Sequence, residues 1–214
     1  MGRRSDHSRA ELEQLILEEG HRQMAEHGFA RFSAREVAKR IGYSIGTLYN
    51  VFGSYDRLIL AINTETFRLW TAHLNDQLAN AGADRIRALV EGYFSFAREN
   101  RNLWTAIYDH RLPAGMLIPE EFLPDRSALT NIVIREVSGV LPEGRHEEVP
   151  RLARSLIATV HGHCSFELDG TFRLMGITDP VELALARVRD SLLAAGSRPI
   201  DPQSSPLGGT IVKR

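Results

Sequence analysis

The segment GYSIGTLYNVFGS, residues 42–54, concentrates side chains that can hydrogen-bond to nucleic acid. Its hydroxyls and its amide belong to Ser44, Thr47, Tyr49 and Asn50. Hydroxyls suit phosphate oxygens, and an asparagine amide can pair with the edge of an adenine. Gly46 costs a helix roughly 1 kcal/mol relative to alanine, but its missing side chain lets the helix lie close to a sugar-phosphate backbone. We therefore expect this segment to use its outer face on a partner.

Basic side chains gather beside this segment, although the formal net charge of the whole chain is only −1. Between residues 31 and 54 the basic side chains are Arg31, Arg35, Lys39 and Arg40. Glu36 is the single acidic residue in that range. Further toward the start, Arg3, Arg4 and Arg9 can reach a DNA backbone. A solvated helix face would show the same charge pattern, so charge alone leaves both interpretations open.

The spacing of His161, His163 and Cys164 argues against a metal site. Zinc-binding residues on a helix are usually three or four apart, whereas these two histidines are two apart and project in different directions. Cys164 is the only cysteine, which excludes an intrachain disulfide and a site with paired thiolates. The sequence predicts neither a metal nor a cofactor.

The run Asp109, His110, Arg111 resembles an acid-base group, but adjacent helical residues point about 100° apart and do not form a dyad. The chain also has no Gly-rich phosphate loop and no Gly-x-Ser-x-Gly turn. We predict that it is not an enzyme.

The elements that position the polar segment are helices, because apolar residues recur at helical spacing and no long alternating run is present. Ser8 with Glu11 three residues later predicts a capping box, and Gly28 ends that helix. Ser33 with Glu36 predicts a second capping box, and Gly42 stops the short helix that follows. The fold class is therefore all-α.

Only two residues separate Gly42 from Ile45, so the second and third helices are joined by a tight turn. This is the layout of a helix-turn-helix, whose second helix enters the DNA major groove. Leu48 and Phe52 then face a small core, opposite the polar side chains.

Residues 28–62, GFARFSAREVAKRIGYSIGTLYNVFGSYDRLILAI, resemble the DNA-binding segment of TetR-family bacterial transcriptional regulators. The resemblance rests on Gly-Phe before the second helix, the Val-Ala pair within it, Gly42, the run Gly46-Thr47-Leu48-Tyr49, Phe52 and Ser54. It implies an all-helical homodimer with a small three-helix DNA-binding domain. A larger C-terminal domain would bind an effector and dimerise.

The resemblance also carries a set of DNA-contacting positions onto this sequence. These are Arg35, Ser44, Ile45, Gly46, Thr47, Tyr49, Asn50 and Tyr55. Two positions depart from the family pattern, because Tyr55 replaces a usual lysine and Val51 replaces an aromatic residue or histidine. The lost lysine removes one charge for a phosphate, while the tyrosine hydroxyl can still donate there.

We predict a DNA-binding domain over residues 1–54, an effector-binding and dimerisation domain over 55–195, and a disordered Pro-, Gly- and Ser-rich tail over 196–214. The fourth helix should begin at Ser54 and end near Ala81. Further helices are expected at 84–99, 101–111, 120–140, 146–168 and 180–195.

Two residue sets in the second domain are candidates for binding. The aromatic candidates for an effector pocket are Trp70, Phe94, Trp104, Tyr108 and Phe166, although aromatic residues at helical spacing also form ordinary cores. Apolar stripes on the last two long helices predict a dimer interface through Leu152, Leu156, Val160, Val181, Leu185, Val188 and Leu192. One helix pair is not expected to hide both stripes and cover a core as well.

These features predict a cytoplasmic homodimer that binds a palindromic DNA operator as a repressor and is released by a small apolar or aromatic effector. No run of apolar residues is long enough to span a membrane, and no secretory signal is recognisable. The alternative is a helical small-molecule binding protein or enzyme that keeps the helix-turn-helix only as scaffold. A gel-shift with the DNA that flanks the gene separates the two.

Overall fold

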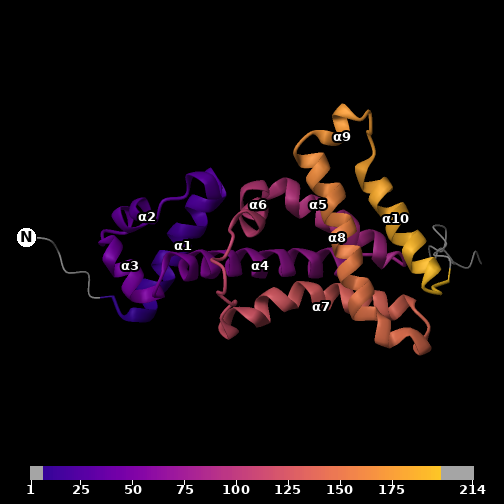
Figure 1. Ribbon diagram of the computed structural model, residues 1–214, viewed down its shortest axis with the longest axis horizontal. Helices are drawn as coiled ribbons and strands as arrows, with labels where there is room; N and C mark the ends of the chain where they lie inside the picture. Colours follow the sequence, from indigo (N-terminus) through magenta and orange to yellow (C-terminus); the bar gives the residue numbers. More distant parts are fainter. Residues whose placement is uncertain (1–6, 199–214) are drawn as a thin grey trace, which may run out of the picture. The chain divides into compact units, whose positions relative to one another are not determined.

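The computed structural model describes residues 7–198, and this part of the chain contains helices and no strands, which confirms the all-α prediction (Figure 1). The longer helices are α1 Arg9–His27, α2 Ala34–Arg40, α3 Ile45–Phe52, α4 Tyr55–Ala79, α5 Arg85–Glu99, α6 Arg101–Asp109, α7 Leu123–Val140, α8 Val149–Leu168 and α10 Pro180–Ala194. The shorter ones are η1 Phe29–Arg31, η2 Glu120–Phe122, η3 Glu143–Glu148 and α9 Thr171–Leu174. None of the described helices is long and apolar enough to cross a membrane.

The first helix begins and ends where the sequence predicts. The Ser8 hydroxyl accepts from the Glu11 amide at 3.3 Å, and the Glu11 carboxylate accepts from the Ser8 amide at 2.7 Å. Both halves of the capping box are therefore present. Gly28 ends α1 with a φ of 72°, a conformation that favours glycine.

The second capping box is only half formed, which corrects the prediction. The Ser33 hydroxyl accepts from the Glu36 amide at 3.3 Å, as expected. The Ser33 amide, however, donates to the side chain of Gln23 in α1 at 2.8 Å. Gln23 is 2% exposed, so packing of α1 against α2 brings its amide to the cap. Glu36 forms an ion pair with Lys39 instead.

The turn between α2 and α3 is closed by local backbone bonds. Gly42 has a φ of 80°, and the Tyr43 amide donates to the Ala38 carbonyl at 2.8 Å. Ser44 is the N-cap of α3, and Gly53 ends that helix with a φ of 84°. The helix-turn-helix thus follows from residues that are neighbours in sequence.

The residues group into two compact units that differ from the predicted linear domains. Unit 1 contains residues up to 72 and residues 96–129, whereas unit 2 contains residues 73–95 and residues from 130 onward. The predicted boundary at 54/55 does not separate the cores, because Ile59, Leu103 and Ala106 pack in the same core as α1–α3. Of the predicted tail, residues 199–214 lie outside the described residues.

Core packing in unit 1 joins the inner faces of α1, α2 and α3 to α4 and α6. The fully or nearly fully buried members include Ile16, Met24, Val37, Ala38, Leu48, Phe52, Leu58, Ile59, Ile62, Leu103 and Ala106. In unit 2, α8 and α10 pack side by side, with the short α9 between them in sequence (Figure 1). The predicted helices at 120–140 and 146–168 each begin with a 3-10 turn, η2 and η3, before the α-helix.

Candidate functional site

The two faces of α3 have opposite character. Leu48 is fully buried and Phe52 is 8% exposed, so both face the unit 1 core as predicted. Ser44, Gly46 and Asn50 are exposed on the other side. Thr47 and Tyr49 are half-buried between the two faces. The helix therefore presents its small and polar residues outward.

Ser44 and Thr47 form one hydroxyl pair at the N-terminus of α3. The Ser44 hydroxyl accepts from the Thr47 amide at 3.2 Å, and the two hydroxyl oxygens lie 3.0 Å apart. A hydrogen bond between two hydroxyls uses only one of their two protons. The second proton remains available to donate to an outside acceptor such as a phosphate oxygen.

Packing within the chain does not require the glycine at position 46. A Cβ added at Gly46 would have the Ser44 Oγ as its nearest neighbour, at an ordinary 3.6 Å. The φ of Gly46 is not positive, so alanine would fit the backbone as well. Since glycine lowers helix stability by roughly 1 kcal/mol, a reason outside the chain is indicated.

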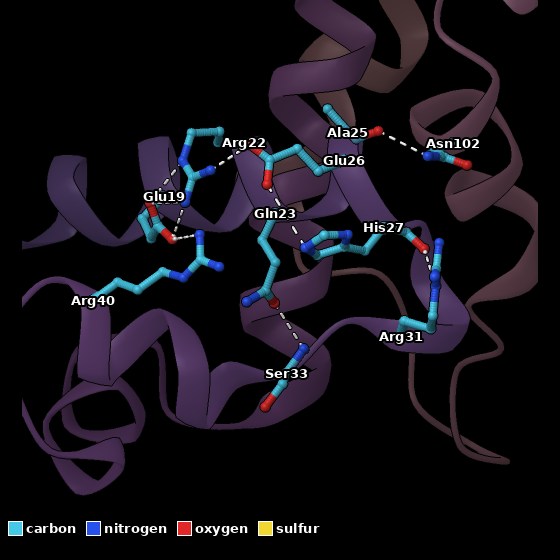
Figure 2. Close-up of polar contacts among 10 residues, drawn as sticks. All are labelled: Glu19, Arg22, Gln23, Ala25, Glu26, His27, Arg31, Ser33, Arg40 and Asn102. Atoms are coloured by element: carbon cyan, nitrogen blue, oxygen red, sulfur yellow. Dashed lines mark hydrogen bonds and ion pairs between the residues drawn. The ribbon is translucent and has the colours of Figure 1, made fainter.

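The basic residues that precede α3 differ in how they are already paired, and Figure 2 shows the contacts of Arg31 and Arg40. The Arg40 guanidinium lies 3.4 Å from the Glu19 carboxylate, and Lys39 lies 3.7 Å from Glu36. Arg31 donates to the His27 carbonyl. Arg35 is exposed and forms no ion pair with any described residue. Of the four basic residues, Arg35 therefore has the charge that is most available to an outside partner.

Residues outside α3 fix the ends of this helix, and sequence patterns did not identify most of them. Arg9 donates to the Val51 carbonyl at 3.1 Å, and Arg57 donates to the Phe52 carbonyl at 3.1 Å. The His7 Nδ1 lies 2.9 Å from the Tyr43 hydroxyl in the preceding turn. Arg9 thus acts on α3 itself, whereas Arg3 and Arg4 lie outside the described residues.

Ile45 and Tyr55 differ from the other predicted DNA contacts because both pack partly against the unit 1 core. The Tyr55 ring is tilted against Phe32, with 6.3 Å between the ring centroids. Burial raises the pKa of Tyr55, and the nearby Tyr49 hydroxyl adds to that effect. Tyr55 therefore serves the core as well as any role at a phosphate.

Polar groups of α1 bond to the start of α2 through a side chain and to α6 through a backbone carbonyl (Figure 2). Gln23 accepts from the Ser33 amide, and Asn102 in α6 donates to the Ala25 carbonyl at 2.8 Å. These bonds join the helix-turn-helix to α6 within unit 1. Neither was predictable from local patterns, because glutamine and asparagine at these positions look solvent-facing.

Unit 2 contains a small apolar cavity of about 40 Å³ that is partly open to solvent. Its lining is aliphatic apart from one tyrosine and consists of Leu74, Ile86, Leu89, Val90, Tyr93, Val133, Val137, Leu156, Ile157, Val160 and Val188. The Tyr93 hydroxyl lies 3.0 Å from the His161 Nδ1. Burial lowers the pKa of His161, which favours the neutral ring at neutral pH.

The five predicted effector-pocket residues are spread over both units. Trp70, Trp104 and Tyr108 belong to unit 1, and Phe94 and Phe166 belong to unit 2. Trp70 is fully buried and stacks on Phe96 with 5.0 Å between ring centroids, while Trp104 and Tyr108 are 5.2 Å apart. Phe94 is fully buried, whereas Phe166 is 45% exposed. None of the five lines the cavity in unit 2.

Most of the predicted dimer stripe is buried within the single chain. Five of its members are under 9% exposed, namely Leu156, Val160, Leu185, Val188 and Leu192. Leu152 and Val181 are half-buried. The apolar stripes therefore pack α8 and α10 into their own unit.

The remaining polar candidates make ordinary hydrogen bonds. The His163 Nδ1 lies 2.7 Å from the Thr159 carbonyl, and Cys164 is buried. Among the described residues, no three His, Cys, Asp or Glu side chains gather as metal ligands. His110 lies 2.9 Å from the Asp56 carboxylate of α4, and the neighbouring Asp109 is exposed.

Comparisons with known families match both parts of the chain. The model of bacterial regulatory proteins of the tetR family matches residues 16–62. The model described as a tetracyclin repressor-like C-terminal domain matches residues 86–192, which is half of the chain. The first match covers α2 and α3, and the second covers most of α5–α10.

Individual relatives are transcriptional regulators. An HTH-type transcriptional regulator of Mycobacterium tuberculosis is 27% identical over 132 residues, covering 60% of this chain and 54% of that protein. The chain thus spans about half the length of this mycobacterial relative. The HTH-type transcriptional regulator BetI of Brucella suis is 26% identical over 182 residues, covering 72% of this chain and 90% of BetI.

Solved structures share the fold. A protein of unknown function from Rhodococcus sp. RHA1 has a TM-score of 0.67 at 20% identity, covering 91% of this chain and 98% of that one. A TetR transcription regulator from Haloarcula marismortui has a TM-score of 0.54 at 18% identity, covering 87% and 98%.

Proposed function

This chain belongs to the TetR family of bacterial transcriptional regulators, and we propose that it is a dimeric repressor that binds a palindromic operator through α3 and responds to a small effector. The observation that carries the proposal is the outer face of α3. It exposes polar groups and a glycine that packing within the chain does not need. The cytoplasm is the compartment in which such a regulator meets DNA.

The residues of α3 take different roles in this proposal. Thr47 and Tyr49 donate their hydroxyls to phosphates and so position the helix without reading sequence. Asn50 is exposed at the outer face and pairs with a base edge, where an adenine contact contributes about 1–3 kcal/mol of discrimination. Gly46 lets the helix approach the backbone, and Arg35 supplies a phosphate contact. Ser44, Ile45 and Tyr55 complete the proposed interface.

The test is a binding titration on the DNA flanking the gene and on scrambled duplexes, each at two salt concentrations. Thr47→Ala and Tyr49→Phe should weaken binding to both duplexes about equally. Asn50→Ala should lower the preference for the flanking DNA by about 1–3 kcal/mol while changing nonspecific binding little. Asn80→Ala is the matched control, because Asn80 is an exposed asparagine outside the unit that contains α3.

If all three α3 variants bind the flanking DNA as tightly as wild type, α3 is not the reading element. The absence of any specific band for the wild type would instead favour a protein that keeps the helix-turn-helix as scaffold. Two-fold symmetry requires half-sites about one helical turn apart or a multiple of it, so footprinting should show a palindrome.

We propose that the dimer forms through the outer faces of α8 and α10, which leaves the buried stripe residues in the core of each protomer. Gly162 supports this location, because a Cβ there would meet nothing within 4 Å and the residue is exposed. Glycine in the middle of α8 therefore costs stability without serving the packing of the single chain. Ala158 and Phe166 are exposed one turn to either side of Gly162.

Light scattering should show a dimer at micromolar concentration, with an interface of more than about 1,200 Å² in total. Gly162→Leu should shift the protein toward monomer, whereas Gly139→Leu, at an exposed glycine of α7, should not. A wild-type monomer would contradict the proposal.

In this proposal the effector lowers DNA affinity because it binds the conformation with weak DNA affinity better than the conformation that binds the operator. Such coupling is reciprocal, so DNA must weaken effector binding by the same factor. Measuring effector affinity with and without the operator duplex tests this equality directly.

A further inference from the structure

Arg126 of α7 is a partly buried cation that rests on an aromatic ring. Its guanidinium carbon lies 4.7 Å from the centroid of the Phe67 ring in α4. Both residues belong to unit 1. A cation over a ring face gains a favourable interaction with the π electrons, but this does not use the hydrogen-bond donors of the guanidinium.

Two carboxylates within five residues of Arg126 in sequence, those of Asp125 and Glu121, are paired with other arginines. Arg68 donates to both oxygens of Asp125, at 3.0 and 2.9 Å. Arg57 forms an ion pair with Glu121. Arg126 itself forms no ion pair with a described residue, although it lies one position from Asp125. Burial lowers the pKa of the Arg126 guanidinium, which records the cost of keeping this charge away from water.

Two further aromatic side chains of unit 1 lie on α6. Tyr108 of α6 partly offsets the lowering of the Arg126 pKa by burial, and its ring centroid lies 5.2 Å from that of Trp104. Tyr108 is half-buried, and Trp104 is 4% exposed. The contact that the structure gives the guanidinium is thus an aromatic ring, that of Phe67, and not a carboxylate.

A second polar group of unit 1, the Asn63 amide, is only half paired. Asn63 precedes Phe67 by one turn of α4 and is 1% exposed. Its amide nitrogen donates to the Ala106 carbonyl of α6 at 3.4 Å, while its Oδ1 has no hydrogen-bond partner among the described residues. A buried acceptor left unpaired is costly, and a ligand that carries a donor can satisfy it.

We propose that unit 1 binds an aromatic carboxylate, with Arg126 holding the carboxylate and the ring lying among Phe67, Tyr108 and Trp104. The planar guanidinium matches a carboxylate with two parallel hydrogen bonds. A hydroxyl on the ring donates to the Asn63 Oδ1. If the chain is the proposed repressor, the acid bound at this site is its effector, so this role of the site rests on the proposed function.

The chemistry of unit 2 favours this choice. Its cavity is lined by aliphatic side chains and by Tyr93, and none of the lining residues carries a charge. An anion placed there would lose its hydration without gaining a cation. Arg126 offers a positive charge without a carboxylate partner on the ring of Phe67, which is the complement of an aromatic acid.

Calorimetry on the full chain without DNA tests the site. The probes are benzoate and its three monohydroxy isomers, each compared with the corresponding uncharged benzamide. At least one acid should bind, and its amide should bind at least about tenfold more weakly, because a charge-assisted hydrogen-bond pair is lost.

Substitutions locate the binding. Arg126→Met should remove acid binding, Arg126→Lys should retain part of it, and Phe67→Leu should weaken it. Arg101→Met is the matched control, because Arg101 is an exposed arginine of the same unit. Arg126→Gln replaces the methionine variant if circular dichroism shows that the latter does not fold.

The inference is overturned if no acid binds at millimolar concentration, if the amides bind as tightly as the acids, or if Arg126→Met and Arg126→Gln bind like wild type. A gel-shift with the same protein distinguishes failure of the acid-binding site from failure of the proposed DNA-binding function. DNA binding that persists without acid binding refutes the site alone, whereas acid binding without DNA binding refutes the repressor.

Discussion

In α1, a Cβ added at Gly20 would lie 2.7 Å from the Cδ1 of Ile62, a fully buried residue of α4. In α3, a Cβ added at Gly46 would find the Ser44 Oγ at 3.6 Å and nothing closer. Both glycines sit inside helices, where each lowers intrinsic helix stability. The first allows two helices to approach, while the second serves nothing within the chain.

This difference separates residues that the fold explains from residues that it does not. In the packed interior, polar groups such as Gln23 and Glu136 have partners within the chain. Gly46 on α3 and the partly buried guanidinium of Arg126 also cost stability, but no packing contact or ion pair within the described chain offsets that cost. A costly residue that has no partner within the chain therefore marks a place where a partner can be sought.

The largest expected loss of stability comes from Gly20→Ala, which should lower the free energy of unfolding by about 2 kcal/mol, because overpacking at the fully buried Ile62 outweighs the better helix propensity of alanine. Chemical denaturation measures this loss. Gly139→Ala is the control, since no atom lies within 4 Å of its added Cβ. If Gly20→Ala and Gly139→Ala change the free energy of unfolding equally, Gly20 is not required for close packing of α1 against α4.

Arg85→Met should lower the free energy of unfolding by about 1.5 kcal/mol at neutral pH, because the Glu136 carboxylate loses its main partner. Glu136 is 7% exposed, and Arg85 bonds to both of its oxygens, at 2.6 and 3.0 Å. Arg135 remains as a second partner at 2.9 Å, which limits the loss.

The same pair makes a prediction about pH. The hydrogen bonds from Arg85 hold the pKa of Glu136 below its ordinary value of 4.5. The stabilisation is therefore complete above that value and is lost as the pH falls through the lowered pKa. Denaturation curves should show the difference between wild type and Arg85→Met shrinking below pH 4.5. A difference that stays constant in acid would contradict the pairing.

Ser8→Ala should cost about 1 kcal/mol, because it removes the capping hydroxyl of α1 without touching the outer face of α3. Ser44→Ala removes a cap of the same type, with its hydroxyl 3.2 Å from the Thr47 amide. Both variants should lose similar stability, but only Ser44→Ala should also weaken DNA binding beyond that loss. Thermal melting and DNA titration of the two proteins provide the comparison.

The smallest effect on stability is also opposite in sign. Gly46→Ala should raise the free energy of unfolding by about 0.5 kcal/mol, because alanine is the better helix former and no contact is crowded. DNA affinity should nevertheless fall, since the methyl group obstructs close approach to the backbone. A variant that is more stable and binds DNA equally well would show that position 46 does not face DNA.

Local signals in the sequence account for the course of the chain through the helix-turn-helix. Ser8, Ser33 and Ser44 cap helices, and Gly28, Gly42 and Gly53 stop them, because caps and left-handed glycines act within a few residues. The polar face of α3 was visible for the same reason, since helical periodicity places Leu48 and Asn50 on different sides.

Only the tertiary structure shows which apolar helix faces are covered by the chain's own core. A stripe such as Leu156, Val160 and Leu185 shows that a helix face is apolar, but only packing shows that the chain's own core covers it. The bond from Ser33 to Gln23 and the unpaired charge of Arg126 likewise depend on residues brought together from different helices. Periodicity reports the face of one helix, whereas burial and pairing are properties of at least two.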